Sequence, residues 1–173
     1  MQTGYKTTFW ISCAIVLLLL LVPTLGSKYL IDLTTEILIY ALFALSLNVL
    51  IGYSGNISFG HAAYFAIGGY SCAILLTTYE LPLIISMPAA IILSGLAAAF
   101  VGYFCVKLTD IYFAMLTLAF GMLVWAVAFK WRAVTGGDDG FVGVNVPAFI
   151  DNRYGFFYFT LFVVTVSAAL LWL

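Results

Sequence analysis

Residues 52–70 read GYSGNISFGHAAYFAIGGY and lie between two long apolar runs. The stretch holds glycines, serines, an asparagine and the chain's only histidine, in a sequence that is otherwise poor in polar side chains. In a bilayer an irregular backbone is tolerated only where protein or a water-filled cavity surrounds it, because hydrocarbon cannot satisfy free amides and carbonyls. If the flanking runs cross a membrane, this stretch predicts an irregular or re-entrant segment near residues 52–61, beside a polar pathway.

The composition places the flanking runs in a membrane. Of 173 residues, 65% are apolar and 8% are charged, and the mean hydropathy is +1.19. Soluble domains are about 45–50% apolar and about 25% charged. Continuous runs such as IVLLLLLV lack the alternation of a membrane β-barrel, and a net charge of −1 offers no surface for nucleic acid. The sequence therefore predicts an all-α, polytopic transmembrane bundle, formed as one domain over residues 1–173.

Six apolar windows are candidate membrane segments, since a spanning helix needs about 20 mostly apolar residues. The first window follows Lys6 and could be a cleaved signal peptide, but bulky Leu25 makes a poor cleavage site, so we expect a retained helix. The last is apolar to Leu173 without the usual interfacial flank, so we expect a further C-terminal portion. The windows are Phe9–Leu25, Leu33–Ile51, His61–Leu76, Leu81–Val106, Ile111–Phe129 and Tyr154–Leu173.

Neutral polar side chains in and beside the opening stretch could line a substrate pathway, because they offer donors and acceptors without a fixed charge. They are Asn48, Ser54, Asn56, Ser58 and His61. Glycines there allow turning or close packing: Gly52, Gly55, Gly60, Gly68 and Gly69. The alternative is an interfacial loop in which Ser58 caps the next helix and His61 bonds a neighbouring helix.

Two further patterns concern packing and a loop. Small residues recur every four positions in the fourth window, a spacing that lets membrane helices approach closely: Ser94, Gly95, Ala98, Ala99 and Gly102. Between the last two windows lies a glycine turn with adjacent carboxylates, whose spacing does not fit a calcium loop: Gly136, Gly137, Asp138, Asp139 and Gly140.

Enzymatic chemistry has little support. One histidine and three scattered cysteines do not form a metal-ligand set, and the absence of a Gly-Lys pair excludes a Walker-type phosphate loop. Residues 52–55, Gly-Tyr-Ser-Gly, match the nucleophile motif of rhomboid proteases, but a serine nucleophile needs a nearby base, and His61 follows too closely in sequence to imitate that family. We therefore expect no catalytic residue, metal or cofactor, and any ATP would be bound by another chain.

Three stretches resemble one family. In order and spacing they are similar to the branched-chain amino-acid ABC transporter permeases. The stretches are Asn48 with GYSGNISFGHAAYFAIGGY, then LTDIYFAMLTLAFGMLV, then WRAVTGGDDGFVGV. The last two resemble the M-type subunit of the Liv-type family. The resemblance covers about Asn48 to Val144 and marks this chain as an N-terminal portion.

The resemblance implies an importer subunit for branched-chain or related hydrophobic amino acids in the bacterial inner membrane. Its partners would be a homologous permease, two ATP-binding subunits and a periplasmic substrate-binding protein. The family's topology would make residues 130–153 periplasmic, although the positive-inside rule applied to the few charges favours the reverse. A permease for urea or short-chain amides is an alternative within the family, and an ion-coupled carrier is disfavoured because the carboxylates lie near segment ends.

Overall fold

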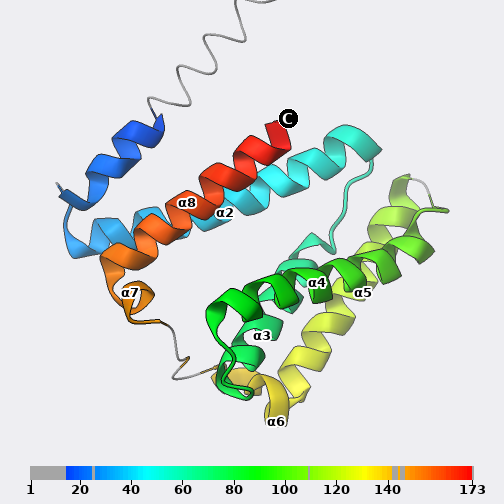
Figure 1. Ribbon diagram of the computed structural model, residues 1–173. Coiled ribbons are helices and arrows are strands. Elements are labelled where there is room, and N and C mark those ends of the chain that lie inside the picture. Colours follow the sequence, from blue (N-terminus) through cyan, green and yellow to red (C-terminus); the bar gives the residue numbers. More distant parts are fainter. Residues whose placement is uncertain (1–14, 25, 109, 142–143, 145–146, 173) are drawn as a thin grey trace, which may run out of the picture. The chain divides into compact units, whose positions relative to one another are not determined.

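The computed structural model describes residues 15–24, 26–108, 110–141, 144 and 147–172, and every regular element within them is helical (Figure 1). The long helices are α2 (Lys28–Ser54), α3 (His61–Thr77), α4 (Leu83–Cys105), α5 (Asp110–Lys130) and α8 (Arg153–Trp172). Shorter elements are a helix over Ile15–Thr24, α6 (Arg132–Thr135), the 3₁₀ helix η1 (Gly137–Asp139) and α7 (Ala148–Asp151). The all-α prediction is confirmed.

Four of these helices, α2, α4, α5 and α8, are long and apolar enough to cross a membrane. Helix α3 has 17 residues and is therefore about 26 Å long at 1.5 Å per residue. The predicted windows agree with α3, α4, α5 and α8 within two residues at each end, whereas α2 begins five residues before its window and ends three after it. Of the predicted segment Phe9–Leu25, residues 9–14 and 25 lie outside the described part of the chain, and the rest is helical.

The chain divides into two compact units, of which the first combines the described residues up to Leu45 with those from Ala148 onward. Its core joins α2 to α8 through Ile31, Leu38, Phe157 and Leu161, all buried, with Leu19, Val22 and Val164 packed around them. The Arg153–Asp32 ion pair joins the first turns of the two helices, and their ribbons run in the same direction (Figure 1). The two helices therefore pack side by side as a parallel pair.

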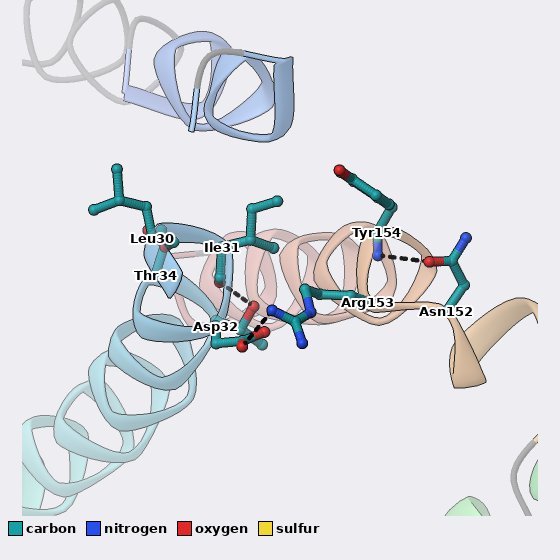
Figure 2. Close-up of polar contacts among 8 residues, drawn as sticks. Leu30, Ile31, Asp32, Thr34, Asn152, Arg153 and Tyr154 are labelled. Carbon is teal, nitrogen blue, oxygen red and sulfur yellow. Dashed lines mark hydrogen bonds and ion pairs between the residues drawn. The ribbon is translucent and has the colours of Figure 1, made fainter. Parts of the chain in front are cut away.

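An ion pair joins the first turns of these two helices, as Figure 2 shows. The Arg153 guanidinium lies 2.9 Å from the Asp32 carboxylate, and both side chains are about half exposed. Asn152 precedes α8 and accepts a hydrogen bond from the Tyr154 amide at 3.4 Å, as N-cap residues do at the free amides of a first turn. The ion pair and the Asn152 cap thus lie where both helices begin.

The second unit covers the described residues from Ser46 to Pro147 and contains the α3–α4 pair together with α5. Helices α3 and α4 lie close at Gly68, where an added Cβ would stand 3.8 Å from the Cβ of Ser94. The Ser94 hydroxyl donates to the Tyr64 carbonyl at 2.8 Å. A polar side chain and a glycine together therefore hold the two helices in contact, as small residues do in membrane bundles.

Only one side of the predicted small-residue stripe takes part in this contact. Ser94, Ala98 and Gly102 are partly buried, whereas Gly95 and Ala99 are exposed, and an added Cβ at Gly95 or Gly102 would meet no atom within 4 Å. Residues one position apart differ by about 100° around a helix, so Gly95 and Ala99 point to another side. The α3–α4 contact is thus made around Ser94 rather than along the whole stripe.

A close backbone approach in this unit is between Gly60 and α5. A Cβ at Gly60 would collide with the Thr117 carbonyl, and a Cβ at Gly121 would lie 3.5 Å from the Gly60 Cα. Thr117 and Gly121 are four residues apart on α5 and so share one face of that helix. This face therefore receives the backbone that precedes α3.

Replacing Gly60 with alanine should lower the unfolding free energy by about 1–3 kcal/mol, the usual cost of forcing an extra methyl into a filled site. Gly52→Ala is the matched control, because Gly52 is helical and has open space at its Cβ position, and alanine there should be neutral or stabilising by about 0.5–1 kcal/mol. Thermal unfolding of the purified chain in detergent measures both. Equal stability of the two variants would contradict the close approach.

Candidate functional site

The break between α2 and α3 is shorter than the sequence predicted. Gly52, Tyr53 and Ser54 continue α2, and the irregular segment is confined to residues 55–60. Gly55 ends the helix with φ of 69° and donates its amide to the Ile51 carbonyl at 2.9 Å, as glycine commonly does after a helix. One glycine within a helix costs only about 1 kcal/mol, so Gly52 does not end α2, whereas the left-handed Gly55 does.

Helix α5 supplies the polar partner of this segment. The Phe59 amide donates to the Thr117 hydroxyl oxygen at 3.3 Å, and the Thr117 hydroxyl donates to the Ala114 carbonyl at 2.9 Å. Thr117 is only 2% exposed. A buried hydroxyl in the middle of an apolar helix therefore satisfies an amide that the break would otherwise leave free.

His61, the first residue of α3, joins that helix to α2 across the break. Its Nε2 lies 2.7 Å from the Ser46 hydroxyl oxygen, and the tautomer decides which group donates. The His61 ring also lies edge-on to the Tyr64 ring, with 6.3 Å between ring centroids. The backbone carbonyl of Tyr64 in turn accepts the hydrogen bond from the Ser94 hydroxyl of α4. Contacts through His61 and its neighbours thus link α2, α3 and α4.

The other predicted pathway residues lie on α2 and in the irregular segment. Asn48 and Ser54 are exposed on α2, Asn56 is partly buried in the irregular segment, and Ser58 is buried. The Ser54 hydroxyl donates to the Leu50 carbonyl at 2.7 Å, and its oxygen accepts from the Asn56 amide at 3.3 Å. The contact of His61 with Ser46 joins one of the five predicted side chains to a different helix.

One expectation about the serines in this stretch is wrong. Ser58 does not cap α3, because the cap position belongs to Gly60 and carries no side-chain hydrogen bond. The Ser54 hydroxyl donates to the Leu50 carbonyl of its own helix, and the sequence predicts no catalytic role for it. Among the glycines, Gly60 and Gly68 stand at close contacts, whereas Gly52, Gly55 and Gly69 have open space.

The second glycine-rich stretch forms a closed turn at the end of α5. The Thr135 hydroxyl lies within hydrogen-bond distance of the Ala128 and Trp131 carbonyls, at 2.5 and 2.9 Å, and its oxygen accepts from the Gly137 amide. Gly136, Gly137 and Gly140 all have positive φ, and a Cβ at Gly136 would collide with the Gly140 carbonyl. The glycines are therefore required by the turn, while Asp138 and Asp139 are exposed on it.

No group of three or more histidine, cysteine, aspartate or glutamate side chains that could hold a metal is found within the described residues. The site thus consists of a backbone break, neutral polar side chains and closely packed glycines. Such an arrangement can bind or pass a polar solute by hydrogen bonding, and it presents no fixed charge.

Comparison with known proteins now identifies the family. Residues 29–173 match the model of the branched-chain amino acid transport system permease component. The chain belongs to this permease family. The match includes both glycine-rich stretches and all the long helices except the first residue of α2, so the break and the α5 contacts are features of a permease domain.

Two curated relatives share the family. The high-affinity branched-chain amino acid transport system permease protein LivM of Salmonella typhimurium is 32% identical over 125 residues, and the LivM protein of Escherichia coli is 31% identical over 125 residues. Each alignment covers 72% of this chain and 29% of the relative, so the chain matches less than a third of the relatives' length. No solved structure matches the chain significantly.

Sequence reasoning missed three residues of the candidate site: Ser46, Thr117 and Gly121. Ser46 lies in an apolar run with no neighbouring motif, and nothing in a single sequence pairs it with His61. Thr117 and Gly121 do carry a signal, because their four-residue spacing is the same small-residue pattern as on α4. That pattern indicates a close helix contact but does not predict which segment makes it.

Thr117→Val should expose the role of this hydroxyl, because valine keeps the branched shape and removes the acceptor for the Phe59 amide. Leaving that amide unpaired should cost about 1–3 kcal/mol of unfolding free energy and speed hydrogen exchange at Phe59. Thr117→Ser is the control, since it keeps the oxygen and should retain slow exchange. Unchanged exchange in Thr117→Val would show that the amide has another partner.

Proposed function

We propose that the chain is the membrane permease part of an ABC importer that moves branched-chain or related hydrophobic amino acids across the bacterial inner membrane. The chief support is the family match over residues 29–173, with the LivM relatives naming branched-chain amino acids as their transported class. The four long apolar helices fit a membrane location. The Ser54 hydroxyl donates to the Leu50 carbonyl of its own helix, which gives the protease alternative no support.

The break between α2 and α3 is proposed as part of the substrate pathway. An amino acid carries an ammonium and a carboxylate, and a fixed protein charge would hold one of them tightly and slow release. Asn48, Ser54, Asn56 and His61 offer hydrogen bonds without such a charge. Residues 55–60 are not in a regular helix, so backbone groups of this segment can also interact with a polar solute where protein or water surrounds it.

The proposed importer needs other subunits. The sequence contains no Walker-type phosphate loop, so two separate ATP-binding subunits would supply the energy and a homologous permease would complete the pathway. A periplasmic substrate-binding protein would deliver the amino acid and carry most of the selectivity. The exposed Asp138 and Asp139 on the glycine turn are proposed to face this binding protein.

His61→Ala and Asn48→Ala should each lower uptake of labelled leucine by cells that carry the whole transporter, while the amount of chain in the membrane stays the same. For His61 the loss should be up to about tenfold, because one hydrogen bond contributes about 0.5–1.5 kcal/mol net and 1.36 kcal/mol is tenfold in rate.

Ser46→Ala separates two roles of the histidine. It should reproduce the His61→Ala defect if the α2–α3 contact is what matters, and should be milder if His61 meets the substrate. Wild-type uptake in both His61→Ala and Asn48→Ala would remove these residues from the pathway. Uptake of labelled urea in place of leucine would favour the amide-permease alternative.

Reversing both charges, with Asp138→Lys and Asp139→Lys together, should weaken stimulation of ATP hydrolysis by the binding protein, because the two carboxylates are solvent-exposed on a turn held by Thr135. Basal hydrolysis should not change. The assay compares purified transporter with and without binding protein at low and high salt, since exposed charges act most strongly at low salt. Equal stimulation in variant and wild type would place the docking surface elsewhere.

A further inference from the structure

The glycine turn that follows α5, residues 136–140, is fixed to the end of that helix. The Thr135 hydroxyl bonds to the Ala128 carbonyl within α5, and a Cβ at Gly137 would stand 3.1 Å from the Phe129 carbonyl oxygen. Both carbonyls belong to the last turn of α5, where a helix has no further amides to offer them. The turn therefore closes the end of α5 and is held in place there.

The last glycine of the turn directs the following residue toward α3. Gly140 has φ of 65° and ψ of −168°, a backbone region that essentially only glycine occupies. Phe141 comes next, and its ring centroid lies 6.1 Å from that of Tyr70 on α3, with the ring planes 55° apart. Both side chains are partly buried, and aromatic rings at this separation attract each other. The turn thus contacts α3 as well as α5.

Helices α3 and α5 are therefore joined at two levels along their length. Gly60, which precedes α3, packs against Thr117 and Gly121 of α5. Tyr70 follows Gly60 by ten residues, and Lys130, the last residue of α5, follows Gly121 by nine. These spacings are about 15 Å and about 14 Å of helix at 1.5 Å per residue, so the second contact lies a matching length beyond the first. Helix α3 cannot shift along α5 at that level without moving the turn or losing the ring contact.

Because the exposed Asp138 and Asp139 lie on this turn, we propose that a binding protein docked on them acts on α3 through the contact of Phe141 with Tyr70. This role rests on the proposed function. A docked partner shifts a conformational equilibrium only by the difference in its affinity for the two conformations, and the ring contact makes the position of the turn depend on that of α3. Helix α3 begins at His61, so its displacement alters the α2–α3 break. Phe141 is thus a positioning residue.

Stimulation of ATP hydrolysis in the whole transporter tests this, because titration with binding protein separates docking from its effect. Phe141→Ala leaves the carboxylates in place, so the basal rate and the concentration for half-maximal stimulation should stay as in the wild type. The maximal stimulation should fall about two- to tenfold, the range expected for loss of one aromatic pair. Phe141→Tyr keeps the ring and should be stimulated fully. Tyr79→Ala is the matched control, since it removes an exposed ring just after α3 and should leave the maximum unchanged.

Two further variants test the geometry of the contact. Gly140→Ala would meet no atom within 4 Å, but alanine disfavours the backbone conformation that directs Phe141, so this variant should reproduce Phe141→Ala. Adding Tyr70→Leu to Phe141→Ala should lower the maximal stimulation no further, because both changes remove the same contact.

The proposal is overturned if Phe141→Ala reaches the wild-type maximum, or if it only raises the half-maximal concentration, since Phe141 would then belong to the docking surface. Additive losses in the double variant with Tyr70→Leu would overturn it as well. A wild-type transporter that the binding protein does not stimulate would overturn the proposed importer together with this role of Phe141. A stimulated wild type beside an unaffected Phe141→Ala would leave the importer standing.

Discussion

The contact between Gly60 and Thr117 is the constraint on which the second unit depends. Where α2 ends, the backbone leaves its helical hydrogen bonds, and in an apolar environment each unpaired amide or carbonyl is costly. Thr117 provides the acceptor for the Phe59 amide, and the missing side chain of Gly60 lets that backbone reach α5. The start of α3, and with it the position of His61 opposite Ser46, follows from this contact.

Helix positions could be predicted from the sequence because they depend on local information. Long apolar runs gave α3, α4, α5 and α8 within two residues. The error at α2 has a local cause as well: glycine and serine at residues 52–54 were read as a break, but the helix continues until Gly55 takes a left-handed conformation. Propensity is a weak signal where a helix can still complete its hydrogen bonds.

Contacts between helices were predicted far less well. His61 was expected to bond a neighbouring helix or to line a pathway, and the structure gives it Ser46 as a contact, yet no local pattern names that partner. The Phe59–Thr117 hydrogen bond spans 58 positions, and a single sequence carries no information about which distant residues meet. Ser94 was predicted for its size, whereas the structure uses its hydroxyl as well, as a donor to the Tyr64 carbonyl.

The parallel direction of α2 and α8 has a consequence for whether α3, the shortest of the long helices, crosses the membrane. Two membrane-crossing helices that start on the same side require an odd number of crossings between the end of the first and the start of the second. Helices α4 and α5 are long and apolar enough to supply two such crossings. If α2, α4, α5 and α8 all cross the bilayer, parity requires α3 to cross it as well, and its 17 residues are at the lower limit for spanning a bilayer.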